Sequence, residues 1–371
     1  MKLWKKLSRA ACMLGMLCIA FLAISYAAEQ NSSLLPEWGE VRGGTYASKL
    51  EQGLKANFPY RQKLTQLALD LKLAGGQRVQ NQIYINKEGL LRNTDPPNKK
   101  ITDKNTQVIM RFGEEEGIPT YLMLIPTASA VKQQLLPNFA QTYNQSRFIE
   151  DTYNQMSGKV TTVDAYNALF NKREEYVYYR TENNLTALGG YYVYTALGKK
   201  MGIENSSLNH FEIQYATDEY RGDLFQRSPY KEVRPDTLAL YCYTRYPRDY
   251  VVTHHVGGEI KTYHTLYPVH LQEMDREMNV YFGGVSSITD FQIASPYSTR
   301  LLVFGDKTAL SYLPFVVNHY QQVTLVDLFQ LSREQAEDVP VNEYDQVLFA
   351  YSLETYSRLD ISTRMEWILS I

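Results

Sequence analysis

Three segments of the sequence carry polar side chains or paired glycines directly after an expected strand. In parallel sheets, ligand sites lie beyond the carboxyl ends of the strands, in the turns that lead into helices. The turn at 305–307 leads into a helix, so a nucleophile there would stand clear of the sheet, and the free N–H groups of the helix start could stabilise an oxyanion. The three segments are 302–309, 179–189 and 281–286, and their candidate ligand-lining residues are Gly283, Gly284, Gly305, Asp306, Thr308, Tyr179 and Arg180.

Short apolar runs alternate with helical patterns in the part of the chain that must position these segments. The run Tyr121–Pro126 suits a strand covered on both faces, and it follows a helical pattern over 104–116. Such alternation is typical of an α/β fold with a mostly parallel sheet and helices on both faces. Further strands are expected at 160–164, 238–243, 250–253, 300–304, 323–327 and 346–351, and further helices at 147–156, 309–320 and 361–369, with one more ending near 201.

We expect three parts along the chain. Residues 1–28 form a leader, residues 29–97 a helical segment followed by a β-hairpin, and residues 98–371 the α/β domain. The helical segment breaks at Asn57-Phe58-Pro59, and the turn signal Asp95-Pro96-Pro97-Asn98 marks the start of the main domain.

The leader has the pattern of an export signal. Four basic residues precede the apolar run Ala10–Ala28, and Ser25-Tyr26-Ala27 fits a cleavage site after Ala27. A run of this length could also remain as a single-span membrane anchor. We therefore expect an extracytoplasmic protein, either secreted or anchored to the outer face of the cytoplasmic membrane, that meets the membrane only through this segment.

Composition excludes several classes of protein. The net charge is −2, and it becomes −6 once the four basic residues of the leader are removed, so no basic surface for nucleic acid is expected. Two of the three cysteines lie in the leader, and Cys242 is expected to be a buried strand residue, so the fold needs no disulfide. His264 and His270 lack a matching carboxylate pattern, and we expect no metal or other cofactor.

In their order along the chain, the three segments resemble blocks of the DHHW proteins of Gram-positive bacteria, which are relatives of the SGNH-type alginate O-acetyltransferases. The shared blocks include 81–89, the strand ending at Pro126 and 344–349, and the resemblance runs from about residue 58 to the C-terminus. It implies an SGNH-like or flavodoxin-like fold. It also implies acetyl esterase or acetyltransferase chemistry with a serine nucleophile, a histidine base and an aspartate.

The blocks that carry the catalytic groups of this family are altered. The run Thr-Asp-His-His-Trp-Thr reads here Thr181-Glu182-Asn183-Asn184-Leu185-Thr186, Gly-Asp-Ser reads Gly305-Asp306-Lys307, and Gly-Gly-Asn reads Gly283-Gly284-Val285. The resemblance therefore assigns the positions of acid, base, nucleophile and oxyanion donor to Glu182, Asn184, Lys307 and Val285. None of these four positions holds the residue of the family.

These replacements predict a catalytically silent protein. The amide of Asn184 has no nitrogen that is basic near neutral pH, and the ammonium of Lys307 at a helix N-terminus is expected to turn into solvent. Loss of a nucleophile or a base costs about 10⁶-fold in turnover. The alternative is an active carbohydrate O-acetyl esterase or acetyltransferase with a rebuilt site, in which Thr308 or Lys307 would act with His254 or His255.

Without a catalytic role, two residues of the turn have simple structural interpretations. Thr308 would be a helix-start hydroxyl that contacts the backbone, and Asp306 would be a turn residue or a helix cap.

The expected partners follow from the export signal and the resemblance. A silent relative of acetylation proteins would act in the cell envelope as a binding or scaffolding factor for a cell-wall glycan or for the O-acetylation machinery. The chain has 30 tyrosines, and their clusters near 176–179, 191–194 and 241–250 could stack on sugar rings. The same tyrosines could equally be ordinary half-buried strand residues.

Overall fold

The computed structural model describes residues 61–369, apart from 257–258, 272–277 and 337–338. By its contacts the chain forms two compact units, Met1–Gly76 and Gln77–Ile371. The leader, its cleavage site and the predicted break at 57–59 lie outside the described residues, and helix α4 (Arg61–Ala74) is the part of the first unit that can be described. Among the helices of the described ranges, none has both the length and the apolar character of a membrane span.

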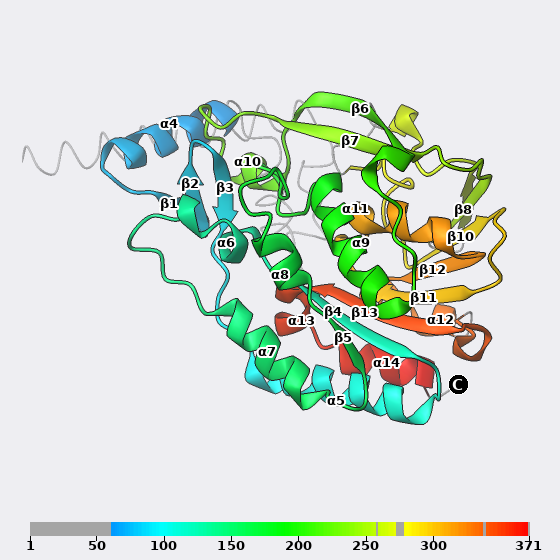
Figure 1. The fold of residues 1–371 in the computed structure, drawn as a ribbon. Helices are drawn as coiled ribbons and strands as arrows, with labels where there is room; N and C mark the ends of the chain where they lie inside the picture. Colours follow the sequence, from blue (N-terminus) through cyan, green and yellow to red (C-terminus); the bar gives the residue numbers. More distant parts are fainter. Residues whose placement is uncertain (1–60, 257–258, 272–277, 337–338, 370–371) are drawn as a thin grey trace, which may run out of the picture. The chain divides into compact units, whose positions relative to one another are not determined.

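An eight-stranded sheet forms the centre of the second unit (Figure 1). Its first five strands run parallel, and the last three continue it as antiparallel partners at one edge. The predicted mostly parallel α/β fold is thereby confirmed. Across the sheet the order is β5 (Thr161–Val163), β4 (Thr120–Ile125), β13 (Gln346–Ser352), β11 (Arg300–Gly305), β12 (Gln322–Val326), β10 (Ile288–Ile293), β8 (Tyr250–Val256) and β9 (Glu259–Tyr263).

Alternate residues of the parallel strands serve two separate hydrophobic cores. On β4, Tyr121 and Met123 face the first core, whereas Leu122 and Leu124 face the second. Because successive side chains of a strand point to opposite faces, a strand covered on both faces requires a continuous apolar run. This requirement explains the apolar sequences of the central strands.

Helices cover both faces of the sheet (Figure 1). The first core includes residues of α6 (Ala128–Val131), α8 (Ala165–Phe170), α9 (Ala187–Met201) and α11 (Ala309–Val316). The second includes residues of α5 (Lys99–Glu115), α7 (Gln145–Gln155), α12 (Arg333–Ala336), α13 (Leu353–Arg358) and α14 (Ile361–Leu369).

Local signals set the ends of the helices that matter most for the site. Helix α5 begins earlier than predicted because the side chain of Asn98 accepts hydrogen bonds from the N–H groups of Lys100 and Ile101. Helix α9 starts where the Thr186 side chain accepts from the N–H of Gly189. Helices α9 and α11 touch closely at Gly190, where a Cβ atom would come within 1.9 Å of the Ser311 carbonyl oxygen.

Two small sheets flank the main one. The predicted hairpin is present as β2 (Ile83–Asn86) and β3 (Gly89–Arg92), joined by β1 (Val79–Gln80), and all three strands belong to the second compact unit. A two-stranded ribbon consists of β6 (Phe211–Tyr220) and β7 (Asp236–Tyr243), with α10 (Asp223–Arg227) in the connection. Cys242 lies on β7 as expected, but it is half-buried rather than buried, and its thiol is free.

Candidate functional site

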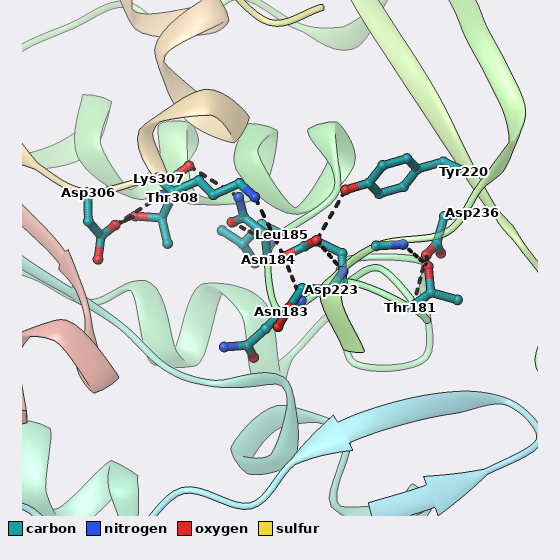
Figure 2. A network of polar contacts seen from close by, with 12 residues as sticks. Thr181, Asn183, Asn184, Leu185, Tyr220, Asp223, Asp236, Asp306, Lys307 and Thr308 are labelled. Atoms are coloured by element: carbon teal, nitrogen blue, oxygen red, sulfur yellow. Dashed lines mark hydrogen bonds and ion pairs between the residues drawn. The ribbon is translucent and has the colours of Figure 1, made fainter. Parts of the chain in front are cut away.

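The site lies at the carboxyl end of β11, where the sequence predicts a strand, a turn and a helix. Strand β11 ends at Gly305, and α11 begins at Ala309 after the turn Asp306-Lys307-Thr308. The segment 181–186 runs beside this turn and leads into α9, the neighbour of α11 (Figure 2).

Asn184 and Lys307 are in direct contact. The Asn184 Nδ2 atom donates to the Lys307 backbone oxygen at 3.1 Å, and its Oδ1 atom accepts from the N–H of Leu185 at 2.8 Å. The two positions to which the resemblance assigns the base and the nucleophile are therefore in contact. A buried amide held in this way cannot take a proton from a nucleophile.

Glu182 is a buried carboxylate that faces Lys307. Its Oε2 atom accepts from the Tyr220 hydroxyl at 3.1 Å and from the Asp223 N–H at 2.9 Å, while Oε1 lies 3.8 Å from Lys307 Nζ (Figure 2). The side chain of Lys307 is 44% exposed, so it does not turn fully into solvent as predicted. The nearby carboxylate attracts the ammonium, and at this exposure the pair contributes below about 1 kcal/mol.

The turn residues Asp306 and Thr308 hold each other in place. Asp306 Oδ1 accepts from the Thr308 N–H at 3.0 Å and from the Thr308 hydroxyl at 2.5 Å, and Oδ2 accepts from the N–H of Ser352 at 2.9 Å. Asp306 acts as a turn residue, in line with its sequence interpretation. The Thr308 hydroxyl donates to this carboxylate and not to the backbone, because the carboxylate is the stronger acceptor.

Asp236 anchors the start of the 181–186 segment, and no sequence pattern singles it out. This fully buried carboxylate accepts from the N–H groups of Arg180 at 2.7 Å and Thr181 at 2.8 Å, and from the hydroxyls of Thr181 and Tyr176. Burial raises its pKa, although these donors oppose the shift. Its partners lie more than 50 residues earlier in the chain, so no local pattern could reveal them.

The glycine block precedes β10 at the same edge of the sheet. Gly283 and Gly284 have φ angles of 98° and 97°, a left-handed region that favours glycine. A Cβ atom on Gly283 would also come within 2.6 Å of the Tyr263 ring. The half-buried side chain of Val285 packs against the first core and has no hydrogen-bond donor. In the strand order, β10 is two strands from β11, or about 10 Å.

Strand register separates His254 from the turn after β11. His254 of β8 is aligned with Thr289 of β10, which is aligned with Leu325 of β12 and, through it, with Val303 of β11. Three strand spacings correspond to about 14 Å. The alternative pairing of His254 with Thr308 or Lys307 is therefore not assembled in this structure.

Both histidines of β8 have other partners. His254 is 3% exposed, its Nε2 atom donates to the Phe282 carbonyl oxygen at 2.8 Å, and its Nδ1 atom lies 3.0 Å from Ser286 Oγ. Desolvation by burial lowers its pKa. His255 Nε2 lies 3.3 Å from the Asp290 carboxylate. Neither imidazole is available to the predicted rebuilt site.

Tyr179 and Arg180 line a cavity next to the 181–186 segment. The Tyr179 ring is buried, with its hydroxyl 3.2 Å from that of Tyr281, and the Arg180 guanidinium lies 4.2 Å from the Tyr176 ring centre. No group of three or more His, Cys, Asp or Glu residues in the described ranges could hold a metal ion.

Comparisons with known proteins give a consistent result. No curated protein matches the chain. The structure resembles that of a DHHW family protein from Eubacterium siraeum DSM 15702, with a TM-score of 0.63, 19% identity, and coverage of 79% of this chain and 96% of that chain. It also resembles Bacillus cereus PatB1 with a sulfonyl adduct, with a TM-score of 0.62, 16% identity, and coverage of 76% and 97%. These likenesses show a shared fold.

The sequence comparison identifies the family independently of the structure. The family described as DHHW protein matches residues 101–326, which is more than half of the chain and includes both the 181–186 segment and the turn after β11. The chain belongs to the DHHW family.

Proposed function

We propose that this chain is a catalytically silent DHHW protein that acts in the cell envelope as a binding or scaffolding factor in polysaccharide O-acetylation. The observation that carries this proposal is the contact set of Glu182, Asn184 and Lys307. Glu182 and Asn184 both contact Lys307, but the three residues carry a carboxylate, an amide and an ammonium.

The chemistry of these three groups supports the absence of catalytic activity. Hydrolysis or transfer of an acetyl ester needs a nucleophile and a base that removes its proton. Asn184 donates a hydrogen bond at the position of the base, and the charged Lys307 has no lone pair with which to attack. The hydroxyl of Thr308 already donates to Asp306, and among the described residues no histidine side chain is hydrogen-bonded to it.

The preserved frame supports a binding role. Glu182, Asn184 and Asp236 are buried polar groups, and each is satisfied by several hydrogen bonds. Burying such groups is costly unless they are paired, so the segment is held in one conformation without any catalytic use. The resemblance implies a polysaccharide or its acetylation machinery as the partner, and the predicted leader supports an extracytoplasmic place of action.

Hydrolysis of p-nitrophenyl acetate tests the proposed silence. Purified protein should release nitrophenol no faster than the Lys307→Ala variant. Turnover by the unmodified chain that Lys307→Ala abolishes would contradict the proposal, because Lys307 would then be a working nucleophile.

A further inference from the structure

A cavity of about 590 Å³ lies beside the 181–186 segment, and neither Glu182 nor Lys307 contributes to its walls. The walls come from the β2–β3 turn and β3, the chain after α6, residues 174–180 and the loop at 232–234. The hairpin is fixed to this lining, since the Leu90 N–H donates to the Arg180 carbonyl oxygen at 2.8 Å. The volume is sufficient for a small organic ligand.

More than half of the residues that line the cavity are charged. The tyrosine rings offer little apolar surface, because Tyr178 and Tyr179 are buried. The Arg180 guanidinium covers the Tyr176 ring, with its carbon 4.2 Å from the ring centre. The cavity therefore selects a ligand by charge rather than by stacking. Its charged residues are Lys87, Lys132, Arg180, Arg234, Glu88, Glu174, Glu175 and Glu232.

Two of the basic residues, Lys132 and Arg180, are half-buried and belong to the same part of the lining. Lys132 Nζ donates to the backbone carbonyl oxygens of Arg173 and Glu175. The Arg180 guanidinium stacks on Tyr176, the residue that follows Glu175. The two cations thus contact adjacent positions of one short segment of chain.

Both cations retain hydrogen-bond donors that the protein does not use. An ammonium has three protons, and Lys132 gives two of them to carbonyl oxygens. Arg180 Nη1 donates to the Pro235 carbonyl oxygen at 3.4 Å, whereas Nε and Nη2 donate to no residue that the structure describes.

Carboxylates of the protein compensate these two cations poorly. Lys132 forms no ion pair within the described part of the chain, and the Arg180 pair with the buried Asp236 is long, at 3.9 Å. Desolvation by burial lowers the pKa of Lys132, and the charge of Arg180 adds to this shift while nearby carboxylates oppose it. A ligand carboxylate would supply the missing counter-charge.

The acidic residues of the lining lie where an ammonium could reach them. Glu175 is already paired, since it accepts from Lys172 Nζ at 2.9 Å and from the Tyr192 hydroxyl. The other three acidic residues are exposed to solvent, so they are open to a cationic group of a ligand. They are Glu88, Glu174 and Glu232.

We propose that this cavity binds a zwitterionic amino acid or short peptide, with the ligand carboxylate on Lys132 and Arg180 and the ligand ammonium at the exposed acidic residues. A guanidinium and a carboxylate form strong, charge-assisted hydrogen bonds. An uncharged ligand would leave the two cations without a counter-charge, and a simple anion would face the exposed carboxylates. The inference goes beyond the proposed function, because it requires neither a silent site nor a glycan.

Isothermal titration calorimetry of the full chain with three probes of similar size tests the proposal. Alanyl-alanine carries both charges, N-acetyl-alanyl-alanine carries only the carboxylate, and alanyl-alanine amide carries only the ammonium. Alanyl-alanine should bind most tightly. The amide cannot satisfy Lys132 and Arg180 and should bind at least about tenfold more weakly, with the N-acetyl probe between the two.

Substitution of each cation tests its assigned contact. Arg180→Gln and Lys132→Met should each weaken binding of alanyl-alanine about tenfold and should not weaken binding of the amide. Because Lys132 also holds backbone carbonyl oxygens, circular dichroism checks the fold of Lys132→Met, and Arg180→Gln carries the test if that variant is unfolded. The matched controls Arg147→Gln and Lys199→Met change exposed residues outside the lining and should leave the affinity unchanged.

Three results would overturn the proposal. They are no binding of alanyl-alanine at millimolar concentration, binding of the amide as tight as that of the dipeptide, and unchanged affinity for the dipeptide in folded Arg180→Gln. Hydrolysis of p-nitrophenyl acetate reports separately on the catalytic silence, so the failure of one proposal is distinguishable from the failure of the other.

Discussion

The turn after β11 and the end of β8 differ in what each would need for catalysis. The turn is accessible but lacks suitable residues, whereas the end of β8 has suitable residues that are buried. At the turn, Asn184 and Glu182 both contact Lys307, whose side chain is 44% exposed, but an amide and an ammonium cannot act as base and nucleophile. At the end of β8, His254 and Ser286 lie 3.0 Å apart and have the right residue types, but each is only 3% exposed. The first region thus lacks a base and a hydroxyl nucleophile, and the second lacks access to solvent.

Hydrogen bonds also keep Ser286 and His254 from acting as a nucleophile and base. The Ser286 hydroxyl donates to the Ile288 carbonyl oxygen at 2.7 Å, so its proton is not directed at His254. Thr289 Oγ1 lies 3.3 Å from His254 Nδ1 and supplies an alternative donor to that nitrogen. The pair is thus part of a satisfied polar cluster, in which the low pKa of His254 also makes it a weaker base.

Restoring the family residues at the turn should produce the largest effect. The triple variant Glu182→Asp, Asn184→His, Lys307→Ser should hydrolyse p-nitrophenyl acetate about 10³-fold faster than the unmodified chain, because a triad normally supplies about 10⁶-fold and Val285 still leaves the oxyanion unaided. The matched control is Lys307→Ser alone, which lacks a base. If the triple variant folds but hydrolyses the ester no faster, the three side chains are not placed to react with one another. Faster hydrolysis by Lys307→Ser alone would mean that another residue acts as the base.

Replacing Asp236, which anchors the 181–186 segment, should lower the free energy of unfolding more than the other single substitutions proposed here. Asp236→Asn replaces an acceptor of several hydrogen bonds with an amide that has a single acceptor oxygen, so buried donors lose their partners. The free energy of unfolding in urea should fall by about 3–4 kcal/mol. Asp151→Asn, at an exposed position on α7, should change it little. A loss below about 1 kcal/mol for Asp236→Asn would mean that the segment is held by other contacts.

Much of the fold could be predicted from the sequence, because strands covered on both faces need continuous apolar runs, which are easy to recognise. Strands β4 and β11 contain uninterrupted apolar runs, and α9 ends at Met201, as predicted, with Gly202 as its cap at a φ of 72°. Strands β6, β9 and β10 were not predicted, and β9 is exposed along most of its length. Most of β6 is exposed and its pairing with β7 is irregular, while β10 carries Asp290, which is bonded by Thr324 of β12.

The candidate site could likewise be predicted only in part. The positions of Glu182, Asn184 and Lys307 follow from the family blocks, but their contacts depend on how α9 packs against α11. The cluster of His254 and Ser286 arises from the pairing of β8 with β10, 32 residues apart, and no local pattern contains that register.

Acid should destabilise the fold because the buried His319 resists protonation. Burial, aided by the nearby Arg248, lowers the pKa of His319 to about 4. The unfolded chain therefore binds a proton near pH 6.5 that the folded chain refuses, and stability falls as pH decreases from about 6.5 to 4. The loss should reach about 2–3 kcal/mol in urea titrations. His319→Gln, which retains a donor or acceptor for Tyr194, should flatten this dependence; an unchanged slope would contradict the assignment.

The smallest expected effect tests whether Ser286 takes any part in chemistry. Ser286→Ala, placed in the triple variant, should leave the regained ester hydrolysis unchanged and lower the free energy of unfolding by about 1 kcal/mol, through the lost bond to Ile288. The exposed Ser207→Ala is the matched control for stability. If Ser286→Ala instead abolished hydrolysis, the nucleophile would be Ser286 beside the end of β8. The contrast between the accessible turn after β11 and the buried pair of His254 and Ser286 would then be wrong.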